Sequence, residues 1–362
     1  MKRILITGAG GTPSANFVRS LRASSESFYL IGVDCNEYYL QRAETNEKYL
    51  VPYADDKDYI PILKEVIQET KPDLLYSQPD QEIYVISKIR SELWDEYGVR
   101  VFLPEHETIK LCQDKFASYL KWMEAGLRVP ETVKINNEDD LRAAFDKFGS
   151  PVWVRAIFSP GGGKGSFRAE NYKVAKAWMD FCEGWGNFTA AKCLRPNSTT
   201  WMSIWKGGEL IVAQGRKRMY WEFANRAPSG VTGITGTGIT ISDPVVDEVV
   251  LKAIIAVDKQ PNGIFSVDLT YDEEGVPNPT EINIGRFFTT HYFFTTAGLN
   301  MPYLFVKLAF NEDIPHIPKK INPLIPGLAW IRGMDFLPVL TDEKTIRLYK
   351  EELEERRRNV SK

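Results

Sequence analysis

The stretch Pro151–Ser166, PVWVRAIFSPGGGKGS, joins a short apolar strand to a loop rich in glycine. The strand carries one cation, Arg155, and a second cation, Lys164, lies inside the loop. Because glycine has no Cβ atom, such a loop lets backbone N–H groups approach a polyphosphate, and Lys164 adds positive charge. The spacing is not that of a P-loop, GxxxxGK[ST]. We expect a phosphate-binding loop, with a flexible surface hairpin as the alternative, and its glycines are Gly161, Gly162, Gly163 and Gly165.

A β-hairpin rich in oxygen ligands follows further along the chain. Gly263–Asp268 and Thr280–Ile284, TEINI, read as its two strands. Asp268 lies on one strand, and Glu281 and Asn283, two residues apart, point to one face of the other. Such oxygen ligands suit Mg²⁺ that bridges nucleotide phosphates, and polar groups on apolar strands are costly to bury without a ligand. The alternative is a solvated face of the hairpin.

The N-terminal third alternates short apolar strands with helices. This order predicts a parallel, doubly wound sheet with short connections. The expected strands are Arg3–Thr7, Tyr29–Val33, Asp73–Ser77 and Val99–Leu103, and the expected helices are Ser14–Arg22, Pro61–Glu69 and Glu82–Tyr97. A longer amphipathic helix is expected over Thr108–Gly126.

The first strand leads into TGAGGTPS, Thr7–Ser14, which we call the glycine turn. Glycine permits a tight turn, a helix N-terminus favours phosphate, and Asp34 after the second strand suits a ribose hydroxyl. The third glycine of the dinucleotide fingerprint is replaced by Pro13 or Ser14. Two interpretations stay open: an NAD(P)-dependent reductase or epimerase that uses this turn, and a Rossmann-like turn that binds no dinucleotide.

Composition narrows the class of protein. The 362 residues carry a net charge of −3, so no global field attracts nucleic acid or a membrane. The four cysteines are scattered without a CxxC pair, and no apolar run approaches the roughly 18 residues that span a bilayer. We expect a cytoplasmic globular protein with no nucleic-acid or membrane partner.

The order of these motifs resembles the ATP-grasp superfamily, and most of all its carbamoyl-phosphate-synthase-like branch. The resemblance implies a mixed α/β and α+β fold, in which a Rossmann-like pre-ATP-grasp domain precedes a two-subdomain ATP-grasp fold. The implied divisions are a pre-ATP-grasp domain at 1–108, a small subdomain with the glycine-rich flap at 109–186, a subdomain with the metal site at 187–335, and a charged C-terminal helix at 336–362.

The resemblance also implies roles for individual residues. Arg286, Arg155 and Lys115 would be catalytic cations, and Asp268, Glu281 and Asn283 the metal ligands. ATP would contact Lys115, Arg155, Gly161, Gly162, Gly163, Lys164, Lys192, Cys193 and Leu194, and the acceptor would meet Gly10, Gly11, Arg216 and Arg218. The sequence departs from the family pattern at Ala156, where proline is usual, at Lys192, where an acid is usual, and at Ile284-Gly285-Arg286, where the arginine is one residue late.

The activity implied is that of an ADP-forming carboxylate–amine ligase. Such an enzyme uses ATP with Mg²⁺, or Mn²⁺ in its place, to convert a small-molecule carboxylate to an acylphosphate, which an amine then attacks. A homodimer is expected. Besides the NAD(P)-dependent enzyme, the remaining alternative is a protein that binds ATP without turning it over.

Overall fold

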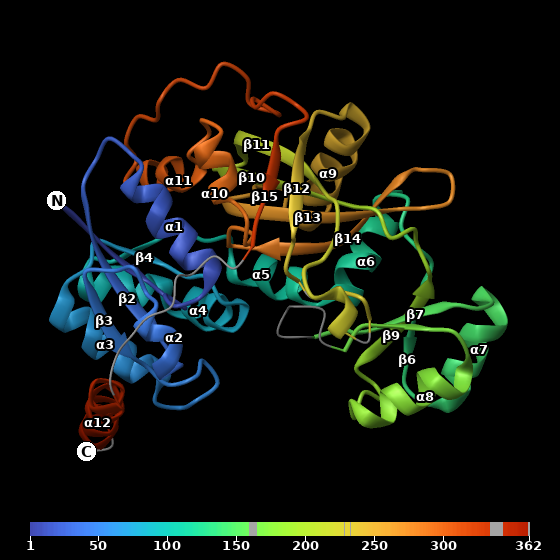
Figure 1. Ribbon diagram of the computed structural model, residues 1–362, viewed down its shortest axis with the longest axis horizontal. Helices are drawn as coiled ribbons and strands as arrows, with labels where there is room; N and C mark the ends of the chain where they lie inside the picture. Colours follow the sequence, from blue (N-terminus) through green and yellow to red (C-terminus); the bar gives the residue numbers. More distant parts are fainter. Residues whose placement is uncertain (159–164, 228, 232, 334–342, 361–362) are drawn as a thin grey trace.

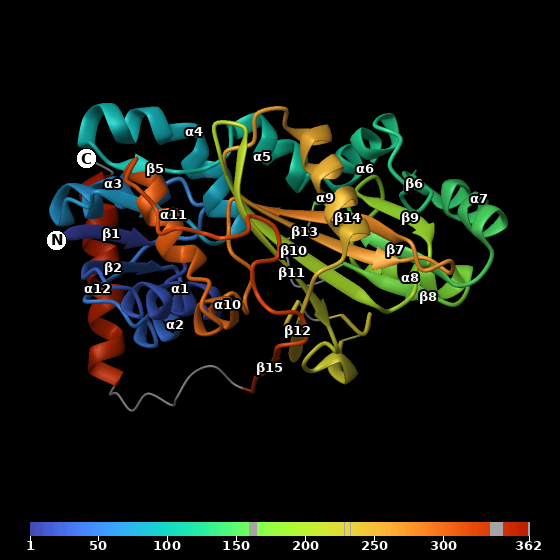
Figure 2. The ribbon, with the colours of Figure 1, turned by 90° about the horizontal axis from the view of Figure 1, so that it is seen from above.

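The computed structural model describes residues 1–158, 165–227, 229–231, 233–333 and 343–360. Its strands form three sheets of five, six and four strands. The five-stranded N-terminal sheet and the four-stranded small sheet lie at opposite ends of the molecule, with the six-stranded sheet between them (Figures 1 and 2).

The N-terminal sheet is parallel throughout, in the order β3-β2-β1-β4-β5. Each strand is short and apolar, and Ile4, Leu5 and Ile6 at its centre are fully buried. This confirms the doubly wound domain predicted from the sequence. Its elements are β1 (Lys2–Ile6), α1 (Thr12–Arg22), β2 (Phe28–Asp34), α2 (Glu37–Gln41), β3 (Glu47–Leu50), α3 (Tyr59–Thr70), β4 (Leu74–Tyr76), α4 (Asp80–Tyr97) and β5 (Arg100–Val101).

The small sheet is antiparallel, in the order β6-β9-β7-β8, and two helices cover it. Its elements are β6 (Thr132–Ile135), α7 (Glu138–Phe148), β7 (Val152–Ala156), β8 (Phe167–Ala169), α8 (Tyr172–Phe181) and β9 (Phe188–Lys192). The loop that carries most of the predicted phosphate-binding glycines joins β7 to β8, but residues 159–164 lie outside the described residues.

The six-stranded sheet is antiparallel, in the order β14-β13-β10-β11-β12-β15. Its two outermost strands on one side form the predicted hairpin. Its strands are β10 (Ser198–Lys206), β11 (Glu209–Arg218), β12 (Thr237–Ile241), β13 (Gly263–Tyr271), β14 (Pro277–Ile284) and β15 (Ala329–Ile331). The remaining helices are α5 (His106–Gln113), α6 (Lys115–Glu124), η1 (Ala224–Arg226), α9 (Pro244–Val257), α10 (Tyr292–Thr296), α11 (Met301–Ala309) and α12 (Glu343–Val360).

The helix expected over Thr108–Gly126 is two helices, α5 and α6, that meet at Asp114. The prediction of one helix was wrong because Asp114 has an extended backbone and its side chain caps α6. Both helices pack against β14 of the six-stranded sheet. The division of the chain at residues 108, 186 and 335 stays a prediction.

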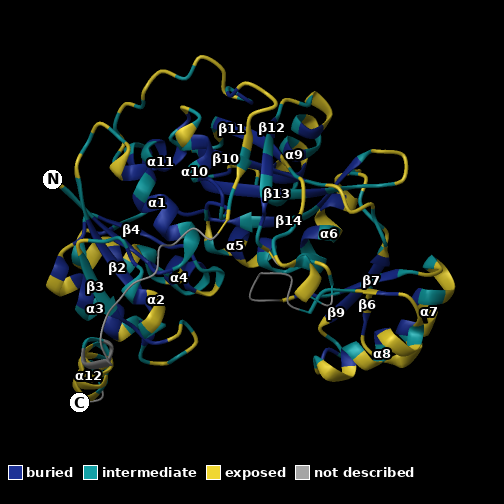
Figure 3. Cartoon of the chain, in the orientation of Figure 1, coloured by how far each residue is buried: buried dark blue, intermediate teal, exposed yellow. Residues whose placement is uncertain are grey.

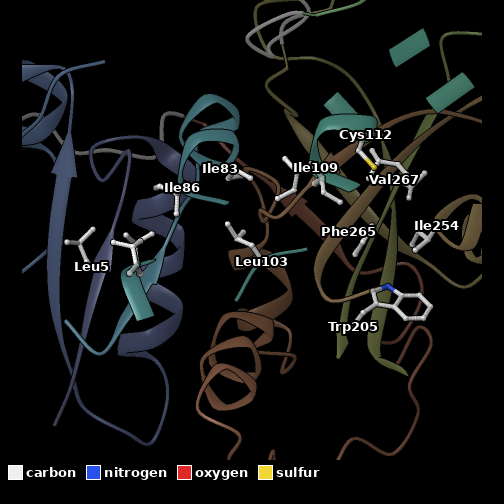
Figure 4. Packing of buried hydrophobic residues seen from close by; sticks show 14 of the residues in the cluster. Leu5, Ile83, Ile86, Leu103, Ile109, Cys112, Trp205, Ile254, Phe265 and Val267 are labelled. Carbon is white, nitrogen blue, oxygen red and sulfur yellow. The ribbon is translucent and has the colours of Figure 1, made fainter. Parts of the chain in front are cut away.

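A continuous apolar core joins the N-terminal sheet to the six-stranded sheet (Figure 4). It runs from Leu5 and Ile86 through Leu103 and Ile109 to Phe265, and all of these side chains are buried. Figure 3 shows that exposed residues concentrate on the outer faces of the helices and in the loops. Close packing in the shared core fixes the position of the N-terminal sheet relative to the six-stranded sheet.

The C-terminal helix α12 packs against the N-terminal domain, beside α2, α3 and β3 (Figure 1). Arg356 pairs with Glu69 at 2.8 Å and Arg357 with Asp56 at 2.7 Å. Within the described ranges, no helix is both long and apolar enough to span a membrane.

Candidate active site

The β13–β14 hairpin brings two carboxylates and an amide to one face of the six-stranded sheet. Asp268 on β13 pairs directly with Glu281 on β14, and Asn283 lies two residues further along. Directly paired residues share a face of a sheet, as do residues two apart on one strand. The Asn283 amide donates to Asp268 Oδ2 at 3.1 Å. The three side chains predicted to bind magnesium therefore lie together.

Glu281 lies among three cations that come from different parts of the chain. Arg155 on β7 donates from Nη2 to Glu281 Oε2 at 2.9 Å and from Nη1 to the Thr280 carbonyl oxygen at 3.1 Å. Burial acts to raise the pKa of Glu281, but the charges of Lys115, Arg155 and Arg286 outweigh it and lower that pKa. Glu281 is therefore ionised at neutral pH, at the centre of a cluster of positive charge.

Lys115 is the first residue of α6. The Asp114 side chain caps that helix by accepting from two backbone N–H groups of its first turn, and the Lys115 N–H donates to the Ile157 carbonyl oxygen at 3.4 Å. These contacts tie the start of α6 to the chain that leaves β7. Burial lowers the pKa of the Lys115 ammonium group, and the charge of Glu281 opposes that change.

Arg286 follows the hairpin and is held by the N-terminal domain. Its Nε and Nη2 atoms contact the two carboxylate oxygens of Asp80 at 2.5 and 3.0 Å, and Nη2 also donates to Asn283 Oδ1 at 2.6 Å. Burial acts to lower the pKa of Arg286, but Asp80 more than compensates and raises it. Asp80, at the start of α4, was missed from the sequence because an acid in the first turn of a helix is common.

The hairpin residues suit magnesium by their chemistry. Within the described part of the chain, no group of three or more His, Cys, Asp and Glu side chains is placed to hold a metal ion. Asp268, Glu281 and Asn283 instead offer two carboxylates and one amide on neighbouring positions. Mg²⁺ binds in this way, through one or two carboxylates with water and substrate phosphates completing its shell.

Arg216 and Arg218 lie on β11, on the same face of the sheet as Asp268. Thr200 on β10 pairs with both Asp268 and Arg216, which places all three side chains on that face. Arg218 Nη2 lies 3.7 Å from Asp268 Oδ1, and the side chain is only 6% exposed. Arg216 is 2% exposed. The two predicted acceptor arginines are therefore buried beside the hairpin.

The glycine turn uses its own backbone N–H groups internally. The N–H of Gly10 donates to Asp34 Oδ2 at 2.9 Å, and that of Gly11 to the Gly8 carbonyl oxygen at 2.9 Å. A Cβ atom on Gly10 would lie 1.8 Å from the Tyr39 carbonyl oxygen, so the residue is glycine because another segment packs on it. A buried carboxylate at the turn disfavours a pyrophosphate in the same place.

The predicted adenine-binding segment lies at the end of β9. Lys192 is the last residue of that strand and is 59% exposed, with Nζ 3.7 Å from Glu273 Oε2. Cys193 and Leu194 follow and are partly buried. Among the predicted flap residues, Gly161, Gly162, Gly163 and Lys164 lie outside the described residues, so their placement stays a prediction.

Comparisons with known proteins show which proteins the chain resembles in sequence. Residues 4–102 match the family model of the PylC-like N-terminal domain. The carbamoyl phosphate synthase large chain of Thermotoga neapolitana is 27% identical over 175 residues, which is 45% of this chain and 16% of that protein. The N-terminal section of the carbamoyl phosphate synthase large chain of Aquifex aeolicus is 26% identical over 185 residues, which is 49% of this chain and 33% of that section. The chain thus spans no more than a third of the length of these relatives.

Solved structures share the fold at low sequence identity. N5-carboxyaminoimidazole synthetase from Staphylococcus aureus, complexed with ADP, has a TM-score of 0.66 and 17% identity, covering 87% of this chain and 78% of that one. The biotin carboxylase from Campylobacter jejuni, in a beta-gamma-ATP complex, has a TM-score of 0.66 and 16% identity, covering 87% of this chain and 72% of that one. L-amino acid ligase from Bacillus licheniformis has a TM-score of 0.64 and 13% identity, covering 85% and 74%.

The three sheets match those of these solved structures, so the chain has the ATP-grasp fold that the resemblance implied. Its first domain is of the PylC-like N-terminal type, and its similarity to the carbamoyl phosphate synthase large chain is distant.

Proposed function

We propose that the protein is an ADP-forming ligase that activates a small-molecule carboxylate with ATP and joins it to an amine. The observation that carries this proposal is the ion pair of Arg155 with Glu281 at 2.9 Å, next to Arg286, which donates to Asn283 on the same hairpin. The charge of Lys115 also acts on Glu281. Phosphoryl transfer needs little covalent help from the protein, because charge neutralisation and positioning supply most of the catalysis. A cluster of fixed cations beside an oxygen-rich metal site is suited to that task.

In this proposal each group of site residues has its own role. Arg155 and Lys115 bind the nucleotide phosphates, and Arg286, fixed by Asp80, neutralises charge on the transferred phosphoryl group. Asp268, Glu281 and Asn283 would hold Mg²⁺, with Mn²⁺ as an alternative; the ion supplies charge stabilisation to the phosphates when bound. Gly161, Gly162, Gly163 and Lys164 would cover the triphosphate, and the backbone of Lys192–Leu194 would receive adenine.

The bond changes follow from this arrangement. A carboxylate oxygen attacks the γ-phosphorus, ADP leaves, and an acylphosphate forms. The amine then attacks the acyl carbon, and phosphate leaves with the former carboxylate oxygen.

We propose Arg216 and Arg218 as acceptor-binding residues; Gly10 and Gly11 are weaker candidates because their N–H groups already donate to Asp34 and to the Gly8 carbonyl oxygen. The protein is proposed to act in the cytoplasm as a homodimer.

A screen for ADP release tests the proposal. Pools of carboxylates and amines are supplied with Mg-ATP, and ADP is measured for the wild type, for Glu281→Gln and for the control Glu273→Gln, whose side chain is 79% exposed. We expect ADP release that needs both pools, persists in the control and is lost in Glu281→Gln. Release that is unchanged in Glu281→Gln would rule out this site as its source.

A binding measurement separates the two alternative functions. Mg-ATP is expected to raise the melting temperature of the wild type, whereas NAD(P) is not. Stabilisation by NAD(P) alone would instead favour an oxidoreductase that uses the glycine turn. Stabilisation by Mg-ATP without ADP release from any pool would favour a protein that binds ATP without turnover.

A further inference from the structure

Arg216 is a buried cation whose hydrogen-bonding capacity is largely unused. Its side chain packs beneath the ring of Phe288, with the guanidinium carbon 4.5 Å from the ring centroid. Nη2 donates to Thr235 Oγ1 at 3.1 Å, but Nε and Nη1 have no hydrogen-bond partner among the described residues. Because burying an unpaired charge is costly, such a group points to a ligand of opposite charge.

Arg218 joins it to form one compact cationic site. Arg218 Nε donates to the same Thr235 hydroxyl at 2.8 Å, and Nη1 donates to Ser198 Oγ at 2.6 Å. Because one oxygen accepts from both guanidinium groups, the two donor nitrogens lie within about 6 Å of each other. The Arg218 guanidinium lies over the indole of Trp221, with its carbon atom 3.5 Å from the ring centroid.

The charge of this arginine pair is not balanced within the described residues. The pair makes one ion pair there, between Arg218 and Asp268 at 3.7 Å. Burial and the charge of Arg218 lower the pKa of Arg216 to about 9, as expected for neighbouring cations with too few anions. Asp268 is moreover one of the proposed magnesium ligands, so a bound ion would take up much of its negative charge.

The position of the pair separates it from the phosphate-binding cations. Strand β11 is two strands away from β13 in the sheet, a separation of about 10 Å between backbones. The long side chain of Arg218 spans most of that distance to reach Asp268. Glu281, whose pKa the charges of Lys115, Arg155 and Arg286 lower, lies on β14, which is one strand further from β11 than β13. A substrate that runs from the metal ligands to the pair would therefore meet cations at both ends.

We propose that Arg216 and Arg218 bind a second anionic group of the acceptor, so that the carboxylate substrate is a dicarboxylic acid. One carboxylate lies beside Asp268 and is phosphorylated, and the other is held by the arginine pair and does not react. This proposal rests on the proposed ligase function and names its substrate class. Monocarboxylates leave the pair without its second anion and bind weakly.

Matched probes that differ by one charge test the proposal. Binding to the full chain, saturated with Mg-ADP, is measured by calorimetry for succinate against succinamate and for glutarate against glutaramate. We expect at least one dicarboxylate to bind about 10-fold or more tightly than its monoamide. In Arg216→Met that preference falls to about 2-fold or less, while the affinity for Mg-ADP stays the same; the control Arg168→Met, at a site 53% exposed, keeps the preference.

Several outcomes decide between the ideas. Equal binding of diacid and monoamide to the wild type, or a preference that survives in Arg216→Met, overturns the dicarboxylate proposal. If Arg216→Met does not fold and so fails to bind Mg-ADP, Thr235→Val replaces it in the test. This variant removes the hydroxyl shared by the two arginines and keeps both charges. We expect it to lower the preference for the diacid at least 3-fold, and an unchanged preference overturns the proposal. Tight diacid binding without ADP release from any pool leaves this site standing and removes the ligase function. ADP release that is equal with monocarboxylates and dicarboxylates leaves the ligase function standing and overturns the dicarboxylate proposal.

Discussion

Glu82→Gln should stabilise the protein at alkaline pH and have little effect in acid. Glu82 lies on α4 and is only 4% exposed, close to Thr7 and Asp34 at the glycine turn. Burial, with the charge of Asp34 adding to it, raises the pKa of Glu82 from 4.5 to about 7. The folded protein therefore holds this proton more tightly than the unfolded chain does.

The magnitude follows from that shift. Between pH 4.5 and 7 the native state binds more protons than the unfolded state, so the free energy of unfolding falls as pH rises through this window and the penalty is constant above it. A shift of about 2.5 pKa units corresponds to about 3 kcal/mol at full effect. Part of that penalty is already present at pH 5, so the advantage of Glu82→Gln over the wild type should grow by about 2 to 3 kcal/mol between pH 5 and pH 8.

Thermal unfolding of both proteins across this pH range measures the effect. We expect the melting temperature of Glu82→Gln to exceed that of the wild type by several degrees at pH 8, and the two to be close at pH 5. The exposed control Glu273→Gln should show no such divergence. In the wild type labelled with ¹³C at the glutamate side chains, one carboxyl resonance should titrate near pH 7 and be absent from Glu82→Gln. A stability difference that does not change with pH would refute the reasoning.

The other predictions concern single contacts. Asp80→Asn leaves the partly buried Arg286 without its carboxylate, so we expect a loss of about 2 to 4 kcal/mol in the free energy of unfolding; a loss below 0.5 kcal/mol, as at an exposed pair, would contradict the geometry. Gly10→Ala places a Cβ atom against the Tyr39 carbonyl oxygen and should lower the melting temperature markedly, and a normal melting temperature would show that the turn is looser. Asn283→Asp keeps the contact with Arg286 but replaces the amide that donates to Asp268 Oδ2 by a carboxylate that repels it, so the variant should melt lower in EDTA than the wild type, with recovery by Mg²⁺; equal melting in EDTA would argue against close packing of residues 268 and 283.

Local patterns in the sequence sufficed for much of this fold. The alternation of short apolar runs with helices predicted the parallel sheet, and the i, i+2 spacing of Glu281 and Asn283 predicted their shared face. The register that sets Asp268 opposite Glu281 also agrees with the predicted hairpin. These features depend on residues close in sequence, which is why they could be predicted.

Contacts between distant residues could not be predicted in the same way. Asp80 and Arg286 are 206 positions apart, and nothing near either residue indicates the other. The glycine turn resembled a phosphate site because its glycines could serve either a ligand or close packing, and only the tertiary structure shows Gly10 against Tyr39. Asp114 likewise fits either the interior of a helix or a cap, and its extended backbone decides for the cap.

Transfer of oxygen from substrate to phosphate tests the central claim most directly. The carboxylate that gives the highest ADP release is labelled with ¹⁸O in both oxygens and incubated with Mg-ATP and the amine, and the released phosphate is analysed by mass spectrometry. Because the acylphosphate loses its former carboxylate oxygen with the phosphate, we predict one ¹⁸O atom in each phosphate released by the wild type and no turnover in Glu281→Gln. Phosphate that carries no ¹⁸O would contradict carboxylate activation at this site.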